Sequence, residues 1–196
     1  YTICKVKLVN KILSHLPFIV LSREKVGMYA LYMATLGNYP DLFAGKPHAS
    51  QLKEPMEYEV TEAYKQADPK FAKLIEVGER YIGYPYVWGG SDPSTSFDCS
   101  GFVSWVLVNS GVKDVGRLGA TSLYGALTPV REDEARPGDI IFFEGTLGEG
   151  VEGNDGITHC GIYVGDGMMI HCGSPISYAD LSRSYWQEHF YGYARA

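Results

Sequence analysis

A single cysteine marks the junction between a polar loop and an apolar run. In YPYVWGGSDPSTSFDCSGFVSWVL, residues 84–107, Cys99 follows Asp98 and precedes the small residues Ser100 and Gly101. A helix beginning at Cys99 would lower the pKa of the thiol, because the unpaired N–H groups of a helix N-terminus favour negative charge. The same N–H groups could hold the oxyanion of an attacked carbonyl. Cys99 is therefore a candidate nucleophile, although cysteine is more often a buried structural residue.

A thiol nucleophile needs a base, and two of the five histidines flank a turn signal. His159 and His171 lie in THCGIYVGDGMMIHC, residues 158–172, with Gly165-Asp166 midway between them. Residues equidistant from a hairpin turn lie opposite each other on one face. We expect His159 to be the base and His171 to orient it, provided that the register does not shift by one residue. The other histidines are expected at solvated positions: His15, His48 and His189.

The four cysteines are expected to be free thiols. None forms a CxxC pair, and their spacing fits neither a zinc ribbon nor a dense disulfide framework. Cys160 and Cys172 each follow a histidine, so alternation points them to the opposite face of the hairpin, where they would pack in the core. Two histidines and two cysteines on opposite faces cannot converge on one ion. We therefore predict no metal site and no cofactor.

The elements that must position these residues are predicted to be helices first and strands afterwards. Asp68 followed by Pro69 is typical of a helix start. An order of helices and then strands favours an α+β fold, with the helices on one face of an antiparallel sheet. The predicted elements are helices over residues 69–82 and 99–109, a buried strand at 138–145, the hairpin at 158–172 and a last strand in YGYARA.

Composition excludes some kinds of partner. The chain has 196 residues, is 45% apolar and carries a net charge of −6. A globular domain of this size has room for one real core. The negative charge argues against nucleic acid as a partner and against direct attachment to an anionic membrane.

Four segments resemble the NlpC-type family of bacterial cell-wall cysteine peptidases, a papain-like group. In the family's order they are YPYVWGG, FDCSGF, RPGDIIFF and THCGIYVGDGMMIH, all within residues 71–196. The resemblance implies a papain-like fold with N-terminal helices on a central antiparallel sheet and the nucleophile at a helix N-terminus. It also implies Cys99 as the nucleophile, His159 as the base and His171 as the polar third position.

The family acts on peptidoglycan stem peptides, which it cuts between γ-D-glutamate and a diamino acid. The resemblance therefore implies a stem peptide as partner and a secreted or cell-wall-associated location. Tyr86 would lie beside the nucleophile, and Trp88 of the same segment would contact substrate. Asp98 and Ser100 would help to hold the free amine end of the stem.

Residues 1–66 are predicted to be an N-terminal extension and linker, followed by the peptidase domain at residues 67–196. Residues 1–9 favour a strand and residues 23–36 a helix, whereas residues 39–56 have no period. No signal peptide is visible, and we expect other domains of a longer protein beside this chain. The stretch TLGNYPDLF is similar to segments preceding such domains in proteins of conjugative elements, where the role would be local wall opening.

Two alternatives to an endopeptidase stay open. An amidase or acyltransferase could use the same Cys-His-His set, because the set specifies acyl transfer through a thioester and not the acceptor. A non-catalytic wall-binding module could retain the fold, although such a module has no need of all three residues.

Overall fold

The computed structural model describes residues 55–147 and 156–196. The predicted strand at 1–9, the predicted helix at 23–36 and nearly all of the predicted linker lie outside these residues. Cys4, His15 and His48 lie outside them too. Within the described ranges, no helix is long and apolar enough to cross a bilayer.

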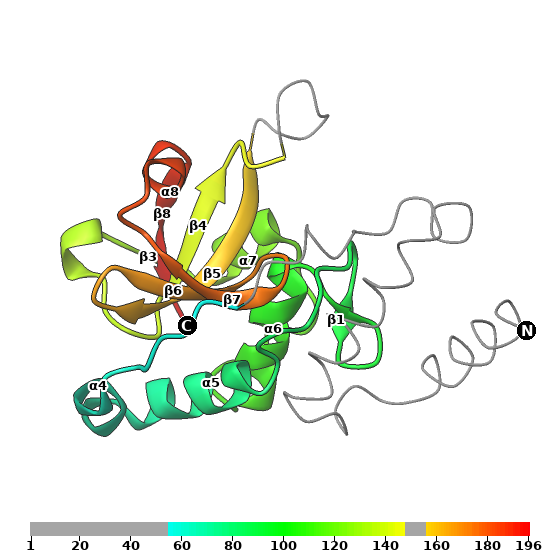
Figure 1. The fold of residues 1–196 in the computed structure, drawn as a ribbon. Coiled ribbons are helices and arrows are strands. Elements are labelled where there is room, and N and C mark those ends of the chain that lie inside the picture. The colour runs from blue at the N-terminus through cyan, green and yellow to red at the C-terminus, as the bar shows by residue number, and fades with distance from the viewer. Residues whose placement is uncertain (1–54, 148–155) are drawn as a thin grey trace, which may run out of the picture.

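Helices precede most of the strands along the chain, and one face of the sheet carries the longest helices (Figure 1). The helices are α4 (Glu62–Ala67), α5 (Pro69–Glu79), α6 (Cys99–Asn109), α7 (Ala120–Ala126) and α8 (Ser184–Glu188), with a short 3₁₀ turn at Glu132–Glu134. The strands are β1 (Ser91–Asp92), β2 (Ser96–Phe97), β3 (Thr128–Val130), β4 (Ile140–Glu144), β5 (Ile157–Gly165), β6 (Met168–Cys172), β7 (Ile176–Asp180) and β8 (Phe190–Arg195).

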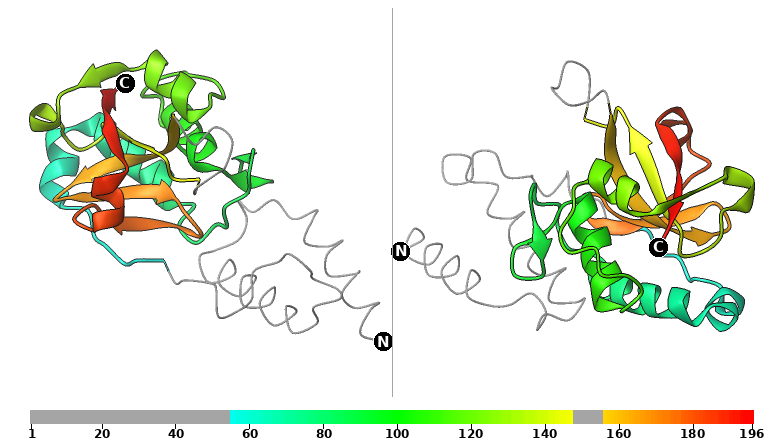
Figure 2. Two further views of the ribbon diagram at one scale, coloured as in Figure 1. Left: turned by 90° about the horizontal axis from the view of Figure 1, so that it is seen from above. Right: turned by 180° about the vertical axis from the view of Figure 1, so that it is seen from behind.

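Six strands form one antiparallel sheet in the order β3-β8-β4-β5-β6-β7, and β1 pairs with β2 as a separate ribbon. Alternate residues of β4 face opposite sides of this sheet. Ile140 and Phe142 join the main core with α5 and α6, whereas Ile141 and Phe143 join a second cluster with Trp186 of α8. The α+β prediction is confirmed, and Figure 2 shows the same layers from above and from behind.

The start of α5 is the predicted one. The Asp68 carboxylate accepts from the N–H groups of Lys70 (2.9 Å) and Phe71 (3.3 Å), and Pro69 occupies the first turn, where it loses no helical hydrogen bond. The helix ends at Glu79, three residues before the predicted end. Tighter turns then lead to Gly83, whose φ of +91° suits glycine.

Two glycines let the loop before Cys99 pack against α6. A Cβ on Gly101 would lie 2.1 Å from the Gly90 carbonyl oxygen, and a Cβ on Gly90 would lie 2.6 Å from the Ser96 carbonyl oxygen. The Asp98 N–H donates to that same Gly90 oxygen at 3.0 Å. Only glycine leaves room for this approach, so the loop is held directly over the N-terminus of α6.

The predicted pairing within the β5–β6 hairpin is wrong by two residues. The turn consists of Asp166 and Gly167, with φ values of +52° and +68°, and β5 is irregular just before it. His171 therefore lies opposite Gly161 and not opposite His159. A shift of two residues preserves the face, so both histidines still lie on one side of the sheet.

The chain already packs on the domain before residue 66. The hydroxyls of Tyr58, Thr61 and Tyr64 all donate to the Asp166 carboxylate, at 3.2, 3.2 and 2.8 Å. These contacts join the segment before α4 to the β5–β6 turn. The domain boundary near residue 66 stays a prediction.

Candidate active site

Cys99 is the first residue of α6, as the sequence predicts. The cap residue Asp98 accepts from the Gly101 N–H at 2.6 Å. The N–H groups of Cys99 and Ser100 have no recorded partner among the described residues, so both are available to an anion. The Cys99 side chain is 5% exposed, and its Sγ lies 3.8 Å from the Thr158 carbonyl oxygen on β5.

The two histidines of the hairpin are in direct contact. His159 Nε2 lies 2.8 Å from His171 Nδ1, although the residues are diagonal and not opposite in the sheet. Gly161 lies between them on the same face, and a Cβ there would lie 3.0 Å from the His171 Cβ. Because Gly161 has no side chain, the two rings can meet across it.

The charge on this pair follows from burial. Burial lowers the pKa of His171 well below its ordinary value, and the charge of His159 lowers it further. His171 is thus neutral and accepts at Nδ1, which requires the hydrogen on Nε2 of His159. Nδ1 of His159 is then the nitrogen left to take a proton from Cys99, whose thiol the His159 ring reaches by a hydrogen bond.

The Cys99 thiol has the acidity that a nucleophile needs. A hydrogen bond with the Cys160 thiol is the largest influence lowering the pKa of Cys99 well below its ordinary value. Burial acts in the opposite direction, whereas the hydrogen bond and the charge of His159 lower the pKa further. A larger fraction of the Cys99 thiol is therefore thiolate than in an ordinary cysteine at the same pH.

The predicted positions of Cys160 and Cys172 are confirmed, and Cys160 has an additional contact with the nucleophile. Both side chains are fully buried in the main core, on the sheet face opposite to the two histidines. Cys99 belongs to that same core cluster, which brings the Cys160 thiol to the nucleophile. Cys172 instead donates to the Phe97 carbonyl at 3.2 Å. In the described part of the chain, no three His, Cys, Asp or Glu side chains are grouped to hold a metal ion.

Cys160→Ala is expected to raise the pKa of Cys99, because a buried S–H donor to the thiolate is lost. The rate of Cys99 alkylation by iodoacetamide should then rise at a higher pH than in the unsubstituted chain. Cys160→Ser restores an O–H donor and should restore most of the shift. Cys172→Ala is the matched control, because this buried thiol donates elsewhere. Identical alkylation profiles for all four proteins would remove Cys160 from thiol activation.

The two aromatic residues of the YPYVWGG segment differ in position. Tyr86 is half-buried and lies beside the nucleophile, as the resemblance implies, and its hydroxyl forms a hydrogen bond with Cys99. The pKa of this hydroxyl is raised, and burial contributes more to the shift than the neighbouring thiol does. Trp88 is 76% exposed and has no recorded side-chain contact within the described residues. Its predicted contact with substrate stays a prediction.

Asp98 is fully engaged by the protein itself. Its Oδ1 accepts from the Gly101 N–H and the Ser100 hydroxyl, and its Oδ2 accepts from the Gly89 N–H (3.1 Å) and Arg117 Nη2 (2.6 Å). Arg117 Nη1 also donates to Ser100 Oγ at 3.1 Å. A carboxylate with four donors has no acceptor position left for a substrate ammonium. The predicted role of Asp98 and Ser100 in holding a free amine therefore gains no support from this geometry.

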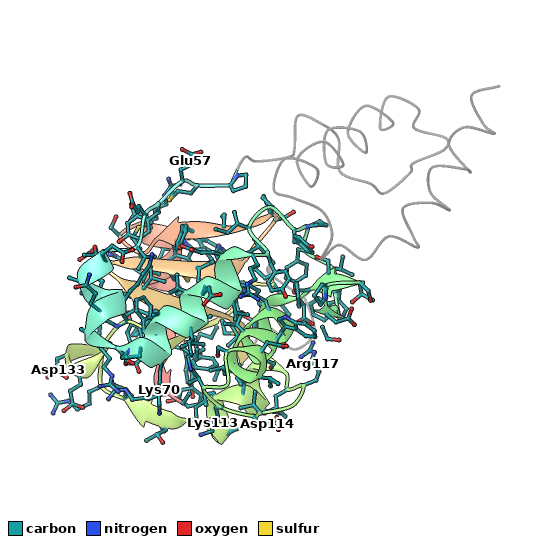
Figure 3. All side chains as sticks on the ribbon, turned by 90° about the horizontal axis from the view of Figure 1, so that it is seen from below. Glu57, Lys70, Lys113, Asp114, Arg117 and Asp133 are labelled. Atoms are coloured by element: carbon teal, nitrogen blue, oxygen red, sulfur yellow. The ribbon has the colours of Figure 1, made fainter. Side chains whose placement is uncertain are left out.

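Sequence reasoning missed two residues of the site. Arg117 lies at the rim of the molecule, beside the segments around α6 (Figure 3), and forms an ion pair with Asp98. Trp186 of α8 contacts both histidine rings. The sequence spacing does not point to either residue, because each lies far along the chain from the residues that it contacts. The only available signal was chemical: a partly buried carboxylate requires a cation or several N–H donors.

Comparisons with known proteins agree on one family. The family model described as "NlpC/P60 family" matches residues 83–195. The chain is 44% identical over 126 residues to the bifunctional muramidase/DL-endopeptidase CwlT of Bacillus subtilis, which covers 64% of this chain and 36% of that protein. It is 33% identical over 156 residues to the murein DD-endopeptidase MepH of Escherichia coli, covering 76% of this chain and 55% of that protein.

A solved structure has the same fold. It is a Staphylococcus aureus protein of the NLP/P60 family described as similar to a lipoprotein, with a TM-score of 0.59 and 36% identity. The match covers 73% of this chain and 44% of that one. The names of these relatives give no support to an origin in a conjugative element. One assignment follows from the matched segment, from the helices before the six-stranded sheet and from the fold of this relative: the chain belongs to the NlpC/P60 family.

Proposed function

We propose that the chain is a peptidoglycan endopeptidase that cuts stem peptides between γ-D-glutamate and the diamino acid. The observation that carries this proposal is the hydrogen-bonded His159–His171 pair beside a cysteine of lowered pKa at a helix N-terminus. The names of the relatives support cell-wall peptide substrates. Such a substrate requires a location outside the cytoplasmic membrane, at the cell wall.

The geometry supports a thioester mechanism. His159 Nδ1 takes the thiol proton, and the Cys99 thiolate attacks the γ-carbonyl carbon of the D-glutamyl residue. The oxyanion is held by the N–H groups of Cys99 and Ser100. The imidazolium then gives its proton to the leaving amine of the diamino acid, and the C–N bond breaks.

Hydrolysis of the thioester uses the same residues in the same positions. His159 takes a proton from water, and the hydroxide attacks the thioester carbonyl. The C–S bond breaks, a carboxylic acid leaves, and the thiolate–imidazolium pair is restored. No step requires a metal or an oxidant.

A second candidate bond is the D,D cross-link between stems, because one relative of the chain is a murein DD-endopeptidase. Purified muropeptides with either lysine or meso-diaminopimelate, as monomers and as cross-linked dimers, distinguish the two. Mass spectrometry of the products should show cleavage after D-glutamate in monomers. Cleavage of dimers alone, to give intact monomers, would replace the proposed bond by the cross-link.

The same digest also tests whether the stem peptide must have a free amino terminus. Because Asp98 is engaged by Arg117, free and N-acetylated stem peptides should be cut at similar rates. A strong preference for the free amine would mean that substrate displaces Arg117 from Asp98. That result would restore the subsite implied by the family resemblance.

A further inference from the structure

Trp186 lies on the sheet face opposite to α5 and α6. It belongs to α8, the short helix between β7 and β8, and packs in the second hydrophobic cluster. The helix is fixed at its C-terminal end to β4. The Glu144 N–H donates to the His189 carbonyl at 2.8 Å, and His189 Nδ1 lies 2.8 Å from the Glu144 carbonyl oxygen.

The Trp186 indole touches both histidines. Its ring stacks on the His159 ring, with centroids 5.7 Å apart and an interplanar angle of 27°. It meets the His171 ring edge to face, at 5.1 Å and 84°. Phe143 of β4 packs against the indole at 4.8 Å. One side chain thus contacts both members of the pair, which are joined by a 2.8 Å hydrogen bond.

Two physical effects follow from this contact. The indole blocks rotation of the His159 ring toward the second cluster, so Nδ1 stays directed at Cys99. An aromatic face also favours a cation over it, and exclusion of water strengthens the hydrogen bond between the two histidines. The first effect fixes the direction of the His159 ring, and the second stabilises the positive charge that this ring gains when it takes the Cys99 proton.

We propose that Trp186 is a positioning residue that holds His159 toward Cys99 and stabilises its protonated form. The proposal rests on the proposed function for the direction of proton transfer. It concerns thiol activation, which can be measured without any peptide substrate. Trp186 is partly buried, in the second cluster, and contacts the nucleophile only through His159.

The test compares Trp186→Leu, Trp186→Phe and Tyr185→Ala in a Cys4→Ser background. Leucine keeps an apolar side chain without the aromatic face, and phenylalanine keeps an aromatic face. Tyr185 is the matched control. It is 46% exposed and meets the Trp186 ring edge to face, and its recorded ring contacts do not include His159 or His171. Cys160 and Cys172 are fully buried, so alkylation by iodoacetamide reports on Cys99. Cys99→Ser provides the blank.

Trp186→Leu is expected to slow alkylation at neutral pH about tenfold and to move its onset to higher pH. On muropeptides kcat should fall by a similar factor, with KM nearly unchanged. Trp186→Phe should retain most of the alkylation rate and of kcat, and Tyr185→Ala should match the unsubstituted chain in both. If circular dichroism shows that Trp186→Leu does not fold, Trp186→Phe decides the question on the same readouts, and a small decrease in its alkylation rate and kcat is the expected result.

The possible failures are distinguishable. An unchanged alkylation profile and unchanged kcat in folded Trp186→Leu would overturn the positioning role. A loss through KM alone would instead make Trp186 a substrate contact. If the unsubstituted chain cuts no muropeptide and the alkylation shift still occurs, the proposed substrate is wrong and the role of Trp186 stands.

Discussion

Cys99→Ser is expected to reduce the rate of muropeptide cleavage at least about 1000-fold without loss of the fold. The Cys160 thiol and His159 lower the pKa of the Cys99 thiol, so the reactive thiolate forms more readily than in an ordinary cysteine. A serine hydroxyl is far less acidic, and the same neighbours cannot ionise it. Oxygen is also smaller than sulfur, so the structure around the first turn of α6 should accommodate it.

Circular dichroism, thermal unfolding and a muropeptide digest on the purified variant check this result. Cys172→Ala serves as the control, because Cys172 is buried in the same core and its thiol donates to the Phe97 carbonyl. Its cleavage rate per folded molecule should match that of the unsubstituted chain. Substantial turnover by folded Cys99→Ser would remove Cys99 from the mechanism.

Much of the site could be predicted because its signals are local in sequence. Asp98, Cys99 and Gly101 form a cap, a first helical residue and a close-packed glycine within four positions, and each role depends on backbone geometry. The α+β architecture also followed from local order, since helices precede the six-stranded sheet. His159 and His171 were placed on one face because alternation along a strand is a strict period of two.

The remaining features depend on long-range packing that no local pattern encodes. The hairpin register shifted because the turn residues are Asp166 and Gly167 and because β5 carries an irregularity before them. Cys160 was predicted only to pack in the core, since alternation places it on the face opposite to His159. Alternation does not say which face α6 covers, and α6 brings Cys99 to the face of Cys160. The contacts of Arg117 and Trp186 join segments distant in sequence and needed the three-dimensional structure.

The stability of the fold at low pH is expected to depend on His171. The pKa of His171 in the folded chain is lowered below its unfolded value, chiefly by burial. Below a pH of about 6.5, the unfolded chain therefore binds more protons at His171 than the folded chain does. The stability that the neutral His171 ring contributes to the fold is lost as the pH falls through that region. The His171→Asn variant should lack this pH dependence of stability, because asparagine has no group that titrates in this pH range.

His159→Ala should reduce cleavage nearly as much as loss of the nucleophile, whereas His171→Asn should keep a measurable fraction. The alanine removes both the proton acceptor and the cation beside the thiolate. An asparagine oxygen can replace His171 Nδ1 as acceptor from His159 Nε2, which His171→Ala cannot do.

The pH dependence of cleavage should separate these roles further. In His171→Ala the thiolate–imidazolium pair lacks the acceptor on Nε2 of His159, so the pH profile of kcat/KM should narrow from the alkaline side. His171→Asn should keep most of the width. Because the three residues act as a unit, the double variant His159→Ala/His171→Ala should be little worse than His159→Ala. Equal inactivation by His159→Ala and His171→Asn would contradict this division of roles. Cys99 alkylation profiles unchanged in both would show that neither histidine activates the thiol.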